Sequence, residues 1–371
     1  MNGKTADNLF LLLKSALWQD GQYVEPVADA DWKELYALAR EQCLVGVVAD
    51  AFKYFPKGKI GGEDKLRWLA YVVQLERRNR GMNRLIGRLF RKLRNDGLSP
   101  VLLKGQSFAA NYPCPLHRQC GDIDVYFKRR EDCRMAVEWA SAMDRAAAES
   151  AENRRDYKHF AFSLNGNEVE LHYLMCVFEN RRLQQRLQTI IDRELDDNSP
   201  YYVEIDGERI ETVPPTLSVL HQLMHISRHL LEAGVGLRQI CDLAMFFDRH
   251  YDEIDRTRLG GYLKALELTM VAQALGYIMV DRLGLRPEKL PFGMSACYAD
   301  FILDEIFEGG NFGRKKTEYR NGANAFSRKL QSVFYFYRRC KLYRPLFPSE
   351  AKSYFLNKIK LNFKLLTANN H

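Results

Sequence analysis

Gly121-Asp122-Ile123-Asp124-Val125 is the stretch from which the architecture of this 371-residue chain can be worked out. Alternate residues of a β-strand project from the same face, so Asp122 and Asp124 point together while Ile123 and Val125 point into a core. Two adjacent carboxylates repel each other, and a divalent cation between them makes the pairing favourable. Mg²⁺ prefers such hard oxygen ligands. The stretch therefore predicts a strand with a metal-binding pair; the alternative is a solvated strand edge.

A second acidic strand follows in a hairpin. Apolar and polar side chains alternate on both sides of Asn165-Gly166, a strong signal for a two-residue turn. The register of such a turn puts Glu170 and His172 on the polar face of the hairpin. If this face also presents the aspartate pair, three carboxylates converge, which is enough for a two-metal phosphoryl-transfer site.

Upstream, a short apolar strand ends in the loop Lys104-Gly105-Gln106-Ser107, before an expected helix. Glycine lets backbone amides approach a phosphate, a helix start favours anions, and Ser107 offers a hydroxyl. Lys104 and Arg118 are candidate partners for phosphate charge, with a surface position as the alternative for each. The loop, the aspartate strand and the later acidic strand follow one another in the order expected of a phosphate-handling site.

These segments together resemble the uncharacterised nucleotidyltransferase family of the DNA polymerase β-like superfamily. The resemblance covers about residues 66–250, and it is carried by the spaced combination of segments. Those segments are Leu103-Lys104-Gly105, Arg118 with Gly121-Asp122-Ile123-Asp124, Val169-Glu170-Leu171-His172, and the blocks at 221–229 and 236–244.

The resemblance implies that two Mg²⁺ or Mn²⁺ ions support transfer of an NMP from an NTP to an unidentified acceptor hydroxyl, with release of pyrophosphate. It implies that Asp122 and Asp124 bind both metal ions and that Glu170 is the third carboxylate. Gly105 and Ser107 would contact the nucleotide phosphates. The superfamily loop usually has glycine followed directly by serine or glycine, whereas a glutamine intervenes here.

A histidine-rich block follows in the helical part of the chain. His221, His225 and His229 are spaced four residues apart, which places them along one helical face. One reading is a zinc site completed by Asp242. A second is that His225, His229, Arg238 and Asp242 line the acceptor pocket, together with the hairpin histidine described above. A third, which we expect, is an Arg238–Asp242 ion pair at i, i+4, buried between helices.

We expect an α+β fold in which a small mixed β-sheet forms the core between helical flanks. Residues 1–97 would form N-terminal helices on the core, 98–180 the catalytic core, 181–313 a helical substrate-side domain, and 314–371 a basic, aromatic helical tail. Helices are expected at 32–43, 64–95 and 131–147, strands at 100–103, 123–127, 160–164 and 168–173, and a polar, extended break at 197–215.

The composition is that of a soluble globular protein, with 46% hydrophobic and 27% charged residues. The eight cysteines are scattered without a CxxC pair, which favours reduced thiols in a cytoplasmic protein over a zinc ribbon or a disulfide framework. No apolar run approaches the roughly 18 residues that span a bilayer. Charged residues flank the apolar run at 9–13, which argues against a signal peptide.

The predicted tail carries most of the positive charge. From residue 314 onwards there are 14 Lys or Arg and two acids, in a chain of net charge +8. The interleaved aromatic residues allow an anionic partner, such as RNA or a membrane surface. We favour the alternative, two amphipathic helices packed on the core, because aromatics at helical spacing are usually core. An anionic partner would suit a second function, a non-catalytic nucleotide- or polymer-binding protein with a degenerate site.

Overall fold

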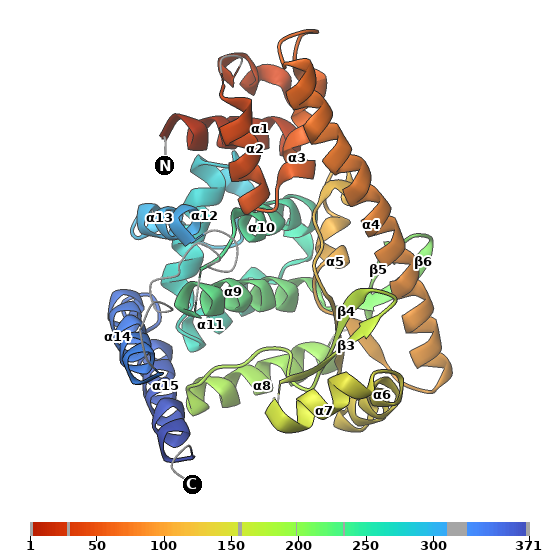
Figure 1. Cartoon of the computed structure of the whole chain (residues 1–371), viewed down its shortest axis with the longest axis vertical. Helices are drawn as coiled ribbons and strands as arrows, with labels where there is room; N and C mark the ends of the chain where they lie inside the picture. The colour runs from red at the N-terminus through yellow and green to blue at the C-terminus, as the bar shows by residue number, and fades with distance from the viewer. Residues whose placement is uncertain are drawn as a thin grey trace.

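The computed structural model describes residues 3–27, 30–154, 158–197, 199–232, 234–309 and 325–368. The fold is α+β, with a six-stranded mixed sheet and helical flanks, as predicted (Figure 1). The strands are β1 (Pro100–Leu102), β2 (Ile123–Phe127), β3 (His159–Leu164), β4 (Asn167–His172), β5 (Tyr201–Ile205) and β6 (Glu208–Thr212). The helices are α1 (Gly3–Trp18), α2 (Trp32–Glu41), α3 (Val45–Ala49), α4 (Gly62–Asn95), α5 (Gln106–Ala109), α6 (Arg130–Met143), α7 (Arg145–Arg154), α8 (Arg181–Asp197), α9 (Pro215–Glu232), α10 (Leu237–His250), α11 (Arg256–Ala265), α12 (Thr269–Asp281), α13 (Ala299–Gly309), α14 (Ala325–Tyr343) and α15 (Pro348–Ala368).

The sheet has the strand order β3-β4-β2-β1-β6-β5. β2 pairs in parallel with β4 and antiparallel with β1, and β1 pairs in parallel with β6. Ile123 and Val125 belong to a hydrophobic core formed with residues of α4 and α6. Because side chains alternate along a strand, Asp124 lies on the opposite face, where α9 also supplies side chains.

The β3–β4 hairpin has the predicted turn. Asn165 and Gly166 both have positive φ, at 51° and 74°, as a two-residue turn that follows the twist of the strands requires. Ala161 pairs with Glu170, and His159 pairs with His172, so the predicted register is confirmed.

The break predicted at residues 197–215 is extended, as expected, but the prediction did not include its pairing into the sheet. This segment forms the β5–β6 hairpin, and β6 joins the sheet next to β1 within the unit that was predicted to be helical. Asp206 and Gly207 make its turn with φ values of 53° and 76°. Asp-Gly between alternating strands is a hairpin signal of the same kind as Asn-Gly, so the sequence contained the information.

The N-terminal helices and α4 form one side of the molecule (Figure 1). α2 begins at Trp32, as predicted, because the Asp31 side chain accepts hydrogen bonds from the first backbone amides of the helix. α4 runs for 34 residues and ends before Gly97, whose φ of 79° stops the helix. The helix predicted at 131–147 is divided at Asp144, the residue between α6 and α7.

The C-terminal helices α14 and α15 pack away from the sheet (Figure 1). Tyr343, Phe347 and Tyr354 are buried in the main hydrophobic core, as expected for amphipathic helices, whereas Phe334 and Tyr337 are exposed. The anionic partner of this tail stays a prediction, and the predicted boundary at residue 314 lies outside the described residues. None of the helices described here combines the length and the apolarity needed to cross a bilayer.

Candidate active site

Three carboxylates meet where β2 lies beside β4. The parallel register pairs Asp124 with Glu170, and Asp122 stands just before β2. One oxygen atom from each of Asp122, Asp124 and Glu170 lies within 4.8 Å of the others. Local sequence patterns predicted the aspartate pair and the hairpin register separately. In the structure the two aspartates and Glu170 form one cluster.

This arrangement suits a divalent metal. Mg²⁺ binds oxygen ligands at about 2.0–2.1 Å, so ligands around one ion lie about 3 Å apart when adjacent and about 4 Å apart when opposite. The three carboxylate oxygens, within 4.8 Å of one another, are near enough to close around one ion by small side-chain rotations. The donor set contains only hard oxygen atoms, which favours Mg²⁺ or Mn²⁺ over zinc.

Lys104 supplies positive charge at the same point. Its Nζ lies 3.1 Å from Asp124 Oδ2 and 3.5 Å from Asp122 Oδ2. Burial disfavours the ammonium ion, but Asp124, Asp122 and Glu170 outweigh it and raise the pKa of Lys104 above its ordinary value. The side chain thus acts as counter-ion to the carboxylates, and it also lines the basic cavity described below, so its contact with phosphate stays a prediction.

The pKa values of the two aspartates shift in opposite directions. The charge of Asp124, together with burial, raises the pKa of Asp122 above its ordinary value. Burial opposes ionisation of Asp124, but Lys104 and a hydrogen bond from His172 hold the pKa of Asp124 below its usual range. Like charges that share a site split in this way. Asp124 is therefore ionised at neutral pH.

Two histidines of the β3–β4 hairpin contact the carboxylates. His172 Nε2 lies 3.0 Å from Asp124 Oδ1 and 3.2 Å from Glu170 Oε2. His159 Nε2 lies 3.5 Å from Glu170 Oε1. Burial lowers the pKa of His172, but the bonds with Asp124 and Glu170 dominate and raise it to about 9. His172, predicted to bind substrate, is thus a partner of the carboxylates. The hairpin register had placed His159 opposite His172, but His159 was not predicted as a site residue.

Two cavities adjoin the carboxylates, and both are lined by Lys104, Asp122 and His225. The first, of about 180 Å³, we call the basic cavity, and the second, of about 340 Å³, the histidine cavity. The two cavities differ in their balance of charged side chains. The basic cavity is lined by four bases and two acids, which are Arg78, Lys104, Arg118, Arg238, Asp122 and Asp242. The histidine cavity is lined by three bases, four acids and five histidines, which are Lys104, Lys158, Arg228, Asp122, Asp124, Glu170, Glu232, His159, His172, His221, His225 and His229.

Arg118 and Asp242 form a buried ion pair in the wall of the basic cavity. Arg118 Nε donates to Asp242 Oδ1 at 2.9 Å and Nη2 donates to Oδ2 at 2.6 Å. Tyr112 donates its hydroxyl to the same carboxylate at 2.8 Å. The predicted Arg238–Asp242 pair was therefore wrong. Arg118 forms a bidentate ion pair with Asp242, and Arg238, one helical turn before Asp242, does not pair with it.

Arg238 is left with a charge that no described carboxylate balances. Only 8% of the residue is exposed, and its Nη1 donates to the backbone oxygen of Gln119 at 2.5 Å. Its Nε has no hydrogen-bond partner among the described residues. A buried guanidinium without an acid is costly, and an anion in the basic cavity would relieve that cost.

The loop after β1 differs from its prediction at Ser107. Gly105 has a φ of 73° and lines the basic cavity, as expected for a glycine that lets a phosphate approach. Ser107 is the second residue of α5 and lines neither cavity. Gln106, inserted between the two, is buried and contacts Met82.

The histidines of α9 line the histidine cavity in neutral form. Burial lowers the pKa of His221 and of His229 to about 3, and that of His225 falls well below its ordinary value. The rings of His225 and His229 lie 4.3 Å apart, edge to face. The zinc reading gains no support, because the described clusters able to hold a metal include no histidine of α9. Neutral imidazoles offer hydrogen bonds to a polar substrate.

The burial of His221 predicts a pH dependence of stability. Between about pH 6.5 and pH 3 the unfolded chain binds a proton at His221 that the folded chain does not, so stability falls as the pH falls. His221→Gln removes this difference. Chemical denaturation should show that the free energy of unfolding of the wild type drops by about 1 kcal/mol more than that of the variant between pH 7 and 5.5. Parallel profiles would contradict the prediction.

Arg78 is a further residue of the basic cavity that was missed. It lies on α4, and its Nη2 is 3.5 Å from the backbone oxygen of Gly121, directly before the aspartate pair. The sequence signal was the run of arginines along α4, which reads equally well as a solvated helix face.

A family model described as an uncharacterised nucleotidyltransferase matches residues 28–284 of the chain. The matched segment contains all six strands and every residue of the site described above. No curated protein and no solved structure matches the chain.

Proposed function

The chain belongs to the uncharacterised nucleotidyltransferase family, and from this premise we propose that it transfers an NMP group from an NTP to an acceptor hydroxyl with the help of Mg²⁺ or Mn²⁺. One observation carries the proposal: the register of β2 against β4 brings Asp122, Asp124 and Glu170 to one point between two cavities of different charge.

The residues have separate tasks in this proposal. Asp122, Asp124 and Glu170 would hold the metal ions, which when bound neutralise charge on the phosphates and lower the pKa of the acceptor hydroxyl. The basic cavity suits the triphosphate, because Arg238 has an unbalanced charge there and Lys104 lies at its boundary with the acids. The histidine cavity suits the acceptor, because the neutral imidazoles of α9 line it.

The proposed transfer replaces one bond of the α-phosphorus by another. The acceptor oxygen forms a bond to the α-phosphorus, and the bond from that phosphorus to the bridging oxygen breaks. Pyrophosphate leaves with the electron pair of that bond, towards the arginines of the basic cavity. The acceptor proton passes to Glu170, which His159 and His172 hold in place.

The decisive experiment is thermal stabilisation by each of the four NTPs with Mg²⁺ or Mn²⁺. A ligand bound to the native state alone stabilises it by about 2.7 kcal/mol at 100 times its Kd. We expect a metal-dependent rise in Tm for at least one NTP. The variant Asp122→Asn/Asp124→Asn should lose the rise, measured against its own Tm, because it lacks the metal ligands. No rise with any NTP would contradict the proposal.

A further inference from the structure

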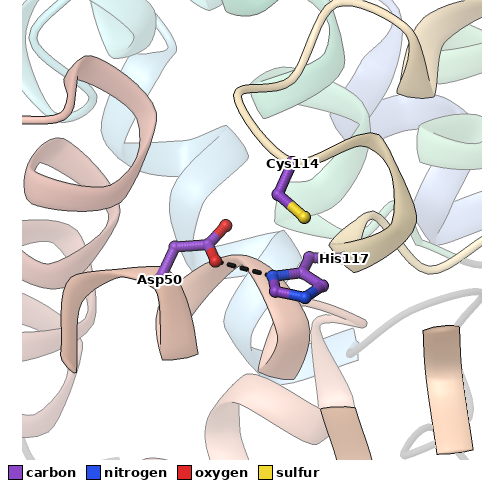
Figure 2. Close-up of side chains that lie close together, drawn as sticks. All are labelled: Asp50, Cys114 and His117. Atoms are coloured by element: carbon purple, nitrogen blue, oxygen red, sulfur yellow. Dashed lines mark hydrogen bonds and ion pairs between the residues drawn. The ribbon is translucent and has the colours of Figure 1, made fainter. Parts of the chain in front are cut away.

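A second cluster of ligating side chains lies outside the active site. Asp50 begins a 3₁₀ turn (Asp50–Tyr54) after α3. Cys114 precedes a 3₁₀ turn (Pro115–His117) between α5 and β2, and His117 is the last residue of that turn. One ligand atom of each residue lies within 4.8 Å of the other two. Figure 2 shows the three side chains pointing toward one another from these separate segments.

The histidine of this cluster is held in a fixed orientation. His117 Nδ1 lies 2.6 Å from Asp50 Oδ1, on the side that faces Cys114, and Nε2 lies 2.9 Å from Glu76 Oε1 (Figure 2). A histidine that ligates a metal through one nitrogen usually donates its other N–H to a carboxylate. Glu76, on α4, occupies that second position and leaves Nδ1 for the cluster.

We propose that Asp50, Cys114 and His117 bind a zinc ion, with Glu76 orienting the imidazole from outside. A thiolate, an imidazole and a carboxylate together form a donor set typical of Zn²⁺, and water would complete the tetrahedron. With zinc–ligand bonds of about 2.0 Å to N and O, the Nδ1–Oδ1 separation opens from 2.6 Å to about 3.3 Å. The donors differ in kind from the all-oxygen site of the sheet.

The location places this ion between the N-terminal helices and the segment that leads to the candidate active site. The cluster joins the N-terminal helices to the segment that leads through Arg118 to Asp122. The same segment is already held closely: Asn79 of α4 donates to the backbone oxygens of Leu116 and Arg118, at 2.7 and 2.9 Å. A metal bridge at this point would fix the entry of the chain into the candidate active site.

The competing state is an imidazolium held by two carboxylates without a metal. Burial opposes the charge of His117, but hydrogen bonds with Asp50 and Cys114 raise its pKa to about 11. Zinc would displace the protons of the imidazole Nδ1 and of the thiol, and only a metal-binding experiment separates the two states.

The test uses the full chain, stripped with a chelator and titrated with Zn²⁺ by calorimetry, with the Tm recorded at each addition. We expect binding of one ion that raises the Tm. Cys114→Ser should weaken the affinity at least 10-fold. Cys297→Ser, at an exposed cysteine, should match the wild type. The ion should persist in Asp122→Asn/Asp124→Asn, which separates this site from the proposed active site.

A spectroscopic measurement does not depend on the folding of a variant. Co²⁺ bound to the stripped wild type should show a thiolate-to-cobalt charge-transfer band that Zn²⁺ abolishes, whereas alkylation of Cys114 should remove it. Absence of that band, or zinc binding that survives in Cys114→Ser and disappears in Asp122→Asn/Asp124→Asn, would overturn the proposal.

Discussion

Glu170→Gln is expected to lower pyrophosphate release from the NTP at least about 10³-fold while NTP binding stays close to that of the wild type. Glu170 lines the histidine cavity and not the basic cavity, so its carboxylate should act on the acceptor side of the reaction. Glutamine has the same shape, but it cannot take a proton or hold a cation as a carboxylate does. Steady-state kinetics with water or a supplied hydroxyl compound as acceptor, together with the Tm shift by NTP, measures both quantities.

A matched control lies two residues away. Glu168 is on the same strand and is exposed, and it lines neither cavity. Glu168→Gln should therefore retain the wild-type rate within about threefold, since surface changes away from a site have small effects. Equal rates in the two variants would refute the role given to Glu170.

Asp242→Asn is expected to reduce the free energy of unfolding by about 3–5 kcal/mol. Asp242 is fully buried and receives hydrogen bonds from both Arg118 and Tyr112. The variant leaves the guanidinium of Arg118 buried without a counter-charge and turns an amide N–H₂ toward it. Urea denaturation followed by circular dichroism would measure the loss.

Asp248→Asn is the control for this effect. Asp248 pairs with Arg286 at 3.1 Å, but the Arg286 side chain is 63% exposed, so water replaces the lost interaction. We expect a change of less than about 1 kcal/mol. A loss of similar size in both variants, or a loss below about 1 kcal/mol in Asp242→Asn, would contradict the argument from burial.

The strands of the site could be predicted because local patterns specify them. The alternation of acidic and apolar residues predicted β2 to the residue, and Asn165-Gly166 determined the register of the hairpin that carries Glu170. The hairpin at 197–215 was not predicted, because only the polarity of this segment was considered and the Asp206-Gly207 turn was overlooked. That strand pair illustrates that turn chemistry is as informative as apolar periodicity.

Partners between distant segments could not be predicted in this way. Helical spacing offered Arg238 as the partner of Asp242, yet Arg118, 124 residues earlier in the chain, takes that carboxylate. Ser107 had a suitable chemistry and spacing, but it lies within α5 and lines neither cavity. The contacts of Lys104 with the acids likewise depend on how β1 and β2 lie together.

The sequence by itself determined the strands that carry the site, the turn at Asn165-Gly166 and the face on which Asp122, Asp124 and Glu170 would lie. These features follow from the period of the backbone and from turn sterics over a few residues. The tertiary structure alone decided the pairing of Arg118 with Asp242, the two cavities and the meeting of Asp50 with His117. Which charged groups pair depends on their distance and desolvation in the folded chain. Neither quantity follows from the spacing of residues along the sequence.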